Sequence, residues 1–311
     1  MKDKVVAIVG PTAVGKTSLG MELAKRFNGE IISGDSMQIY KGMDIGTAKV
    51  TEEEKKAIPH HMIDIKEADE PFSVSEFQTS VQKHIEEINK RNKLPIIVGG
   101  TGLYIDAVLT GYQFSEQKRD PIYQDKIEAE IEKHGIDHVY QRLLQVDPTQ
   151  AKSIHPNNVR RVIRAIEIYD RTGQTMTEHL ASQQKESPYR SVRIGLEMER
   201  SLLYDRINQR VDLMLEEGLL NEVQFFYDQG LANAQSMKAI GYKEFIPYFE
   251  GEYDLTRAIE LLKRNSRRYA KRQYTWFKNK MDVKWYQISP DNKAQVFEKI
   301  YMDLAGILKD I

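Results

Sequence analysis

The sequence predicts an α/β fold, a P-loop NTPase-like core with a parallel sheet, together with a mostly helical insertion domain. Three observations support this prediction. A buried strand, KVVAIVG at residues 4–10, runs straight into the glycine-rich stretch GPTAVGKT at residues 10–17. Strand and helix patterns alternate up to residue 110. Helical patterns alone follow from about residue 111 to residue 188.

The elements of the core follow in order. Residues 16–27 have the apolar spacing of an amphipathic helix, and residues 29–35, GEIISGD, read as a second buried strand. The next helix covers residues 73–92, where Ser73 or Ser75 can cap its first turn. A strand, a glycine turn and a helix repeat the pattern in LPIIVGGTGLYIDAVL. This β-α-β order predicts that the strands lie parallel in one sheet.

The sheet pattern returns after the helical stretch. Residues 191–198, SVRIGLEM, predict one more strand, and the rest of the chain reads as helical. The helical stretch is therefore an insertion and not a tail. We assign residues 1–112 and 189–311 to the core domain, and residues 113–188 to the insertion domain.

Composition excludes several classes of protein. The 311 residues contain no cysteine, so disulfide frameworks, thiolate zinc sites and thiol nucleophiles are excluded. No apolar run approaches the roughly 18 residues of a membrane-spanning helix, and no signal-peptide cleavage site precedes the glycine-rich stretch. We therefore expect a cytoplasmic monomer without membrane attachment. The formal net charge of −1 gives no general preference for nucleic acid, but the charges are unevenly distributed.

The glycine-rich stretch fits the spacing G-x-x-x-x-G-K-T of a phosphate-binding loop. Backbone N–H groups at the start of the following helix bind anions, Lys16 adds a positive charge, and the Thr17 hydroxyl is a ligand for Mg²⁺. No later strand ends in an apolar run followed by an aspartate for a nucleotide's metal; HHMID, residues 60–64, is the nearest and is short. The loop therefore predicts phosphate binding without nucleotide hydrolysis. Its residues are Gly10, Pro11, Thr12, Ala13, Val14, Gly15, Lys16 and Thr17.

Asp35 and Thr101 each follow a predicted strand. The carboxyl ends of parallel strands face the ligand-binding crevice, so both residues are expected beside the phosphate loop. A carboxylate there can accept a proton from an incoming nucleophile. A turn or a helix cap is the alternative role for Asp35. Arg206 and Arg210 lie four residues apart on a predicted helix and so share one of its faces.

Basic residues are concentrated in two segments. The segment from Lys263 to Lys280 has eight lysines or arginines and no acidic residue, interleaved with aromatic residues. Such a segment can neutralise RNA phosphates, while its rings either stack on bases or anchor the helix to the core. In the insertion, NNVRRVIRAIEIY has the spacing of an amphipathic helix. That helix is expected to bury Val159, Val162, Ile163 and Ile166 and to leave Arg160 and Arg164 on its polar side.

Two adjacent histidines, His60 and His61, carry no metal-binding signal. Metal-ligating histidines on one element are usually spaced so that both reach the ion, and a partner cluster of further ligands accompanies them. Neither condition holds here. We interpret both histidines as structural.

Several strings of this sequence resemble, in order and in spacing, the bacterial tRNA dimethylallyltransferase family, also called isopentenyl-tRNA or IPP transferases. They extend over residues 4 to 280 and are GPTAVGKT, GDSMQIYKGMDIGTAK, PHHMID, VGGTGLY, HPNNVRRVIRAIE, QRVDLMLEEGLLNEV, AIGYKE and RRYAKRQYTWF. Members of the family move a dimethylallyl group from its diphosphate to N6 of the adenosine immediately 3′ of the anticodon, in tRNAs that read codons starting with U. Eukaryotic members carry a C-terminal zinc finger, which a chain without cysteine cannot form.

The resemblance implies that the loop holds dimethylallyl diphosphate and not ATP, with Mg²⁺ as cofactor. It also identifies Arg210 as a residue that contacts the diphosphate. Because charge builds on the leaving oxygens, Lys16, the Mg²⁺ on Thr17 and Arg210 are expected to stabilise it. Asp35 is the candidate base for the N6 proton, and Gln38 is expected to offer its amide to the adenine.

The partner that the resemblance implies is tRNA, through its anticodon stem-loop. The adenine has to leave its stack before its N6 can react. We expect it to enter the site from one side and the prenyl diphosphate from the other. The residues predicted to bind tRNA are Asp35, Ser36, Met37, Gln38, Thr101, Val159, Arg160, Arg161, Val162, Ile163, Arg164, Lys271 and Arg272.

Three other functions stay open on the residues alone. A small-molecule or nucleotide kinase would share the phosphate loop and use Asp35 as its base, but it explains neither basic segment. A non-catalytic RNA-binding protein explains the basic segments and leaves the complete phosphate loop without a role. A transferase acting on free adenine nucleotides would need no long basic surface.

Overall fold

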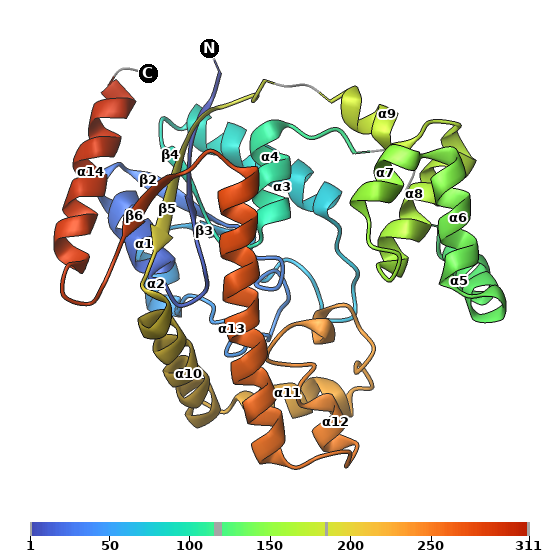
Figure 1. The fold of residues 1–311 in the computed structure, drawn as a ribbon. Coiled ribbons are helices and arrows are strands. Elements are labelled where there is room, and N and C mark those ends of the chain that lie inside the picture. Colours follow the sequence, from blue (N-terminus) through green and yellow to red (C-terminus); the bar gives the residue numbers. More distant parts are fainter. Residues whose placement is uncertain (1, 115–119, 184–185, 310–311) are drawn as a thin grey trace. The chain divides into compact units, whose positions relative to one another are not determined.

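The computed structural model describes residues 2–114, 120–183 and 186–309. The chain divides into two compact units, and Figure 1 draws both. The core unit is Met1–Thr110 with Ser187–Ile311, and the helical unit is Gly111–Glu186. The predicted insertion, residues 113–188, includes residues 115–119 and 184–185, which lie outside the described residues.

The core unit contains a sheet of six parallel strands in the order β3-β2-β4-β1-β5-β6. The predicted α/β fold with a P-loop NTPase-like core and a parallel sheet is therefore confirmed. In β1, the residues from Val5 to Val9 are all buried, as expected for an inner strand covered on both faces. The strands are β1 (Lys4–Val9), β2 (Gly29–Ser33), β3 (His60–His61), β4 (Leu94–Val98), β5 (Arg190–Glu197) and β6 (Lys284–Gln287).

Two strands of this sheet were not predicted. β3 has two residues and β6 has four, so neither is long enough to show a strand's periodicity. The prediction that the chain is entirely helical after residue 198 is wrong, because β6 pairs with β5 at the edge of the sheet. Both strands are edge strands whose position follows from tertiary pairing.

Helices pack on the sheet and extend the core unit. Ser73 caps α3 in a capping box with Glu76, which decides between the two serines considered. α10 and α13 lie side by side (Figure 1). The helices of this unit are α1 (Lys16–Arg26), α2 (Glu52–Ala57), α3 (Val74–Lys90), α4 (Gly102–Thr110), α10 (Arg200–Glu216), α11 (Leu219–Asp228), α12 (Ile246–Phe249), α13 (Leu255–Lys280) and α14 (Lys293–Lys309), with one 3₁₀ turn, η1 (Ser236–Lys238).

The described residues of the helical unit contain helices and no strand, as predicted. A small apolar core holds them together, with Val139, Leu143, Val162 and Ile166 fully buried. The helices are α5 (Pro121–His134), α6 (Ile136–Val146), α7 (Pro148–Ser153), α8 (Val159–Thr172) and α9 (Met176–Ala181). Over the described parts of both units, no helix combines the length and the apolar character that crossing a membrane requires.

Candidate active site

The phosphate loop connects β1 to α1, as its sequence predicts. Gly10 (φ 140°) and Gly15 (φ 108°) have backbone conformations that favour glycine, and a Cβ at Gly10 would lie 2.5 Å from the Leu196 carbonyl oxygen. The Lys16 ammonium folds back over the loop and donates to the carbonyl oxygens of Gly10 (3.0 Å) and Pro11 (2.7 Å). The loop is therefore built around its lysine.

A cavity of about 460 Å³, the phosphate cavity, opens over this loop. The loop contributes Thr12, Ala13, Gly15, Lys16 and Thr17 to its wall, whereas Gly10, Pro11 and Val14 support the loop from outside the cavity. Asp35 and Gln38 line it from the β2 end of the sheet, Arg206 and Arg210 from α10, and Tyr269 and Gln273 from α13.

The charges in the phosphate cavity are mostly positive. Burial and the neighbouring Arg210 lower the pKa of Lys16 to about 7, although Asp35 opposes this shift. Burial also lowers the pKa of the Arg210 guanidinium. Arg206 donates from Nε to the Ala13 carbonyl oxygen (3.1 Å), which ties α10 to the loop. Two crowded cations next to a loop of N–H groups favour an anion that carries several charges.

This crowding predicts proton uptake on ligand binding. A bound diphosphate favours the charged form of Lys16, so its pKa rises above 7 and the complex takes up a proton at higher pH. At pH 8, calorimetric titration with dimethylallyl diphosphate in buffers of different ionisation enthalpy is expected to show uptake of up to one proton. A Lys16→Met variant is expected to lack it, and at pH 6 the difference between the two proteins is expected to vanish. Equal proton counts for both proteins at pH 8 would contradict this interpretation.

A second cavity of about 320 Å³ shares wall residues with the phosphate cavity. The residues that line both are Thr12, Asp35, Thr47, Ala48, Arg210 and Tyr269. Asp35 therefore lies at the wall that the two cavities share. The other residues of the second cavity include Ser36, Met37, Gly46, Lys238, Gly241, Lys243 and Arg272.

The Asp35 carboxylate is held in a tight turn. Its Oδ1 accepts the N–H of Met37 at 2.8 Å, and its own N–H donates to Ser33 Oγ at 3.3 Å. Burial raises the pKa of the Asp35 carboxyl, while the Met37 hydrogen bond and the charges of Lys16 and Arg210 oppose that rise. A carboxylate with a raised pKa inside a cavity has the properties of a general base.

Gln38, predicted to bind the adenine, and Thr101, predicted to bind tRNA, both have protein partners in this structure. Gln38 Oε1 accepts from Ser33 Oγ (2.7 Å), and Gln38 Nε2 donates to the carbonyl oxygens of Thr47 (3.1 Å) and Ala48 (3.3 Å). A contact to a base would have to replace these bonds. Thr101 lines neither cavity, and its Oγ1 accepts the Ser36 N–H at 3.1 Å. Both residues thus support the Asp35 turn.

Sequence reasoning missed Tyr269 and Gln273 as site residues. Gln273 Oε1 accepts the Thr12 N–H at 2.8 Å, and its Nε2 donates to the Gly100 carbonyl oxygen at 3.0 Å. It therefore joins the phosphate loop to the turn after β4. Burial raises the pKa of the Tyr269 hydroxyl to about 12. The sequence did contain a signal for them: Tyr269, Gln273 and Phe277 follow one another at intervals of four residues. This spacing places all three on one face of α13, where Gln273 and Phe277 are buried.

The basic segment of α13 is partly neutralised within the protein. The segment itself has no acidic residue, but Lys263 pairs with Asp212 and Lys278 pairs with Glu197, which lie elsewhere in the chain. Lys271 and Arg272 are exposed, and neither has an acidic partner among the described residues. Arg272 lies over the Tyr269 ring, 5.6 Å from its centroid, and lines the second cavity. These two cations remain available for RNA.

Two predicted RNA contacts on α8 need correction. Val162 and Ile163 are buried in the helical unit's core, so their side chains cannot reach RNA. Arg164, also predicted to bind RNA, pairs with the buried Glu167 carboxylate at 2.7 Å. Arg160 and Arg161 are exposed, and Val159 packs against the core.

Of the two adjacent histidines, His61 has the structural role that was predicted for both. His61 Nε2 lies 2.7 Å from the Glu30 carboxylate, which Arg91 and Lys93 also contact. His60 contacts the Ile58 carbonyl oxygen at 2.7 Å and forms part of the phosphate-cavity wall. Among the residues that the structure describes, no group of three His, Cys, Asp or Glu side chains could hold a metal.

These features define a class. The chain has a P-loop α/β core with two adjoining cavities, one of them over the phosphate loop, and the Asp35 carboxylate lines both. The sequence profile of the IPP transferase family matches residues 38–280, and the chain belongs to that family. The resemblance seen in the sequence is thereby confirmed.

Individual relatives agree with this assignment. The chain is 58% identical to a tRNA dimethylallyltransferase of Oceanobacillus iheyensis, over 100% of this chain and 99% of the relative. The corresponding protein of Bacillus licheniformis is 56% identical, over 99% and 98% of the two chains.

Two solved structures are similar in fold. A tRNA isopentenylpyrophosphate transferase from Bacillus halodurans is 51% identical, with a TM-score of 0.75 over 99% of this chain and 98% of that one. A eukaryotic dimethylallyltransferase, solved in snapshots of its action on tRNA, is 33% identical. Its TM-score is 0.82 over 94% of this chain and 75% of that one.

Proposed function

We propose that this chain transfers a dimethylallyl group from dimethylallyl diphosphate to N6 of an adenosine in tRNA, and releases diphosphate. The adenosine is the one immediately 3′ of the anticodon in tRNAs that read codons starting with U. Membership of the IPP transferase family and the names of the relatives support the reaction. The observation that carries the geometry is that Asp35 lines both cavities.

The chemistry follows from the walls of the cavities. The prenyl diphosphate lies in the phosphate cavity with its phosphates on the loop, and the adenine enters the second cavity after leaving its stack. Asp35 takes the N6 proton while the nitrogen bonds to C1 of the prenyl group and the C1–O bond to diphosphate breaks. Lys16 and Arg210 stabilise the charge that gathers on the leaving oxygens.

We propose Mg²⁺ as a companion of the diphosphate. Asp64, which follows β3, pairs with Lys49 and Lys55 and is not free to bind a metal. The protein therefore offers the Thr17 hydroxyl, and phosphate oxygens and water complete the set that Mg²⁺ prefers. When bound, the ion neutralises part of the diphosphate charge.

The surfaces for RNA are the exposed cations of α8 and α13. Arg160, Arg161, Lys271 and Arg272 can each neutralise a phosphate of the anticodon stem-loop. Such contacts position the RNA and leave recognition of the base to the cavity. We propose that the chain acts as a monomer in the cytoplasm.

The donor preference tests this function against a kinase. A ligand that binds only the folded protein raises its melting temperature, and the rise grows with the ratio of the ligand concentration to its dissociation constant. Dimethylallyl diphosphate with Mg²⁺ is expected to protect the protein at lower concentration than ATP with Mg²⁺, because only the prenyl compound presents a diphosphate without a nucleoside. The measurement is a thermal melt at a series of ligand concentrations. Protection by ATP at the lower concentration would favour the kinase.

A further inference from the structure

The loop that carries Asp35 has no helix or strand of its own. This Asp35 loop, residues 34–50, runs from β2 to α2 and forms a single bridge, between Tyr40 and Lys66. Both of its ends line the cavities, with Asp35 near the start and Thr47 and Ala48 near the end. The Gln38 amide joins the two ends through the Thr47 and Ala48 carbonyl oxygens. A shift of one end is therefore transmitted to the other.

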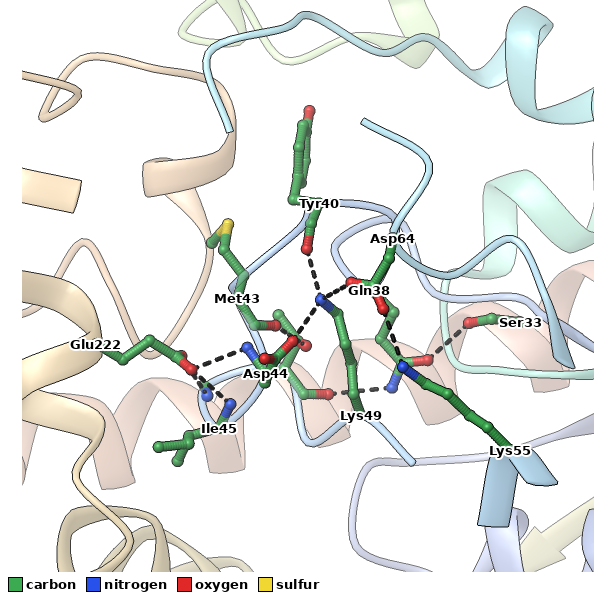
Figure 2. Close-up of polar contacts among 12 residues, drawn as sticks. Ser33, Gln38, Tyr40, Met43, Asp44, Ile45, Lys49, Lys55, Asp64 and Glu222 are labelled. Carbon is green, nitrogen blue, oxygen red and sulfur yellow. Dashed lines mark hydrogen bonds and ion pairs between the residues drawn. The ribbon is translucent and has the colours of Figure 1, made fainter. Parts of the chain in front are cut away.

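Glu222 of α11 holds the outer part of this loop. Its Oε2 accepts the N–H groups of Asp44 (2.9 Å) and Ile45 (2.8 Å), and its Oε1 accepts the N–H of Gly46 (3.0 Å). Figure 2 shows the carboxylate directed at these backbone nitrogens. Hydrogen bonds to a charged acceptor are among the stronger ones in proteins. Glu222 lines neither cavity, so it acts on the site through the segments that it holds.

Tyr242 connects the same carboxylate to a second segment of the cavity wall, the one that contains Gly241. Its hydroxyl donates to Glu222 Oε1 at 2.5 Å, and its ring is fully buried. The ring packs on Gly46, where a Cβ would lie 2.5 Å from it. The preceding residue, Gly241, also lines the second cavity and lies next to Gly46, because a Cβ at Gly241 would lie 3.4 Å from the Gly46 carbonyl oxygen. Glu222 and Tyr242 together hold these two neighbouring segments of the cavity wall.

Lys49 supports the Asp35 loop independently of Glu222. Its side chain is 2% exposed, and its ammonium contacts the Tyr40 carbonyl oxygen, Asp44 and Asp64 (Figure 2). Because this second anchor remains when Glu222 is changed, the loop is expected to shift rather than unfold.

We propose that Glu222 and Tyr242 are positioning residues for the transfer reaction. They fix Gly46, Thr47 and Ala48 and, through Gln38, the Asp35 turn relative to the second cavity. The proposal rests on the proposed function, and it gives a role to the strings LLNEV and AIGYKE, which contain the two residues. Neither side chain touches a substrate.

The first test separates the chemical step from donor binding. Glu222→Gln keeps the size of the side chain but replaces one carboxylate oxygen with an NH₂ group. That group cannot accept a hydrogen bond from the backbone N–H groups that it would face. Misplacement of reacting groups by about 1 Å can cost on the order of 10²-fold in rate, so we expect the single-turnover rate with tRNA to fall at least about tenfold. The dissociation constant for dimethylallyl diphosphate is expected to change less than about twofold, because the phosphate loop is held separately. Tyr242→Phe, which removes only the hydroxyl, is expected to show a smaller loss of the same kind.

Asp228→Asn, at the exposed end of the same helix, is the matched control and is expected to keep the wild-type rate. A lower melting temperature with an unchanged rate per folded molecule would overturn the proposal. If the transfer rate and the affinity for dimethylallyl diphosphate of Glu222→Gln fell by the same factor, that result would also overturn the proposal. A wild-type chain that transfers nothing would overturn the proposed function as well, whereas a failure of this proposal alone leaves the wild type active.

A double-mutant cycle tests the route through Gln38. If Glu222 acts through the Gln38 link, the loss of rate in Glu222→Gln combined with Gln38→Ala is expected to match the larger single loss. Independent effects multiply, because changes at uncoupled sites are additive in free energy. A combined loss equal to the product of the two single losses would overturn the proposed route.

Discussion

Replacing Asp35 with asparagine is expected to lower the single-turnover rate of prenyl transfer by about 10²- to 10⁴-fold, the usual contribution of general-base catalysis. Asparagine keeps the oxygen that accepts the Met37 N–H, so the turn is expected to survive. The affinities for tRNA and dimethylallyl diphosphate are therefore expected to change little. Rapid-quench experiments measure the transfer rate, and equilibrium binding on the same preparation measures the two affinities.

The alternative role for Asp35 is structural, as a residue that only stabilises its turn. In that case the substitution would cost about 1 kcal/mol of stability and leave the transfer rate intact. Asp69→Asn, an exposed residue of the core unit, serves as the control and is expected to leave rate and melting temperature unchanged. A variant that melts early yet transfers at the normal rate would rule out Asp35 as the base.

The direction of the Asp35 pKa shift adds a pH dependence to this prediction. Only the ionised carboxylate can take the N6 proton, and burial raises the pKa of Asp35 above its ordinary value. The transfer rate is expected to fall as the pH falls through that raised pKa, at a higher pH than for an ordinary aspartate. In Asp35→Asn this dependence is expected to disappear from the residual rate.

Arg210→Gln is expected to produce the second large effect. Removing one donor from developing negative charge typically costs about 10²- to 10³-fold in rate. Arg210 lines both cavities, and the charge on the diphosphate oxygens grows as the C1–O bond breaks. The rate of the chemical step is therefore expected to fall by more than the affinity for dimethylallyl diphosphate. Single-turnover rates at saturating donor, together with donor binding, measure the two effects.

Arg200→Gln is the matched control for Arg210. Arg200 begins the same helix, lies over the Tyr204 ring at 5.1 Å and lines neither cavity. We expect it to retain the wild-type rate. An Arg210→Gln variant with weaker donor binding and an unchanged chemical step would mean that the arginine binds the ground state and the transition state equally.

The parts of the fold that local pattern controls could be predicted from the sequence. The phosphate loop needs glycine at two backbone positions and a lysine beside them, and this requirement is visible in eight consecutive residues. The strands with long apolar runs, and the helices whose apolar residues recur at helical spacing, could also be predicted. β3 and β6 were not, because each is short and its pairing depends on neighbours far away in the chain.

The candidate site was only partly predictable for the same reason. Asp35, Lys16 and Arg210 lie in recognisable strings, and the structure brings them to one cavity. Gln273 and Glu222 support that cavity through contacts to residues more than 170 positions away in the sequence. Arg164 was assigned to RNA through the family resemblance, and its ion pair with the buried Glu167 on the same helix was not foreseen. Partners of this kind depend on packing and have no local signature.

Transfer of label tests the central claim most directly. The protein is incubated with Mg²⁺, unmodified tRNA that reads codons starting with U, and dimethylallyl diphosphate labelled in the prenyl group. We predict that label enters the tRNA at N6 of the adenosine 3′ of the anticodon, with diphosphate released in equal amount, and that a tRNA with guanosine at that position stays unlabelled. Absence of label from the tRNA, or equal labelling of free adenine nucleotides, would contradict the proposed function.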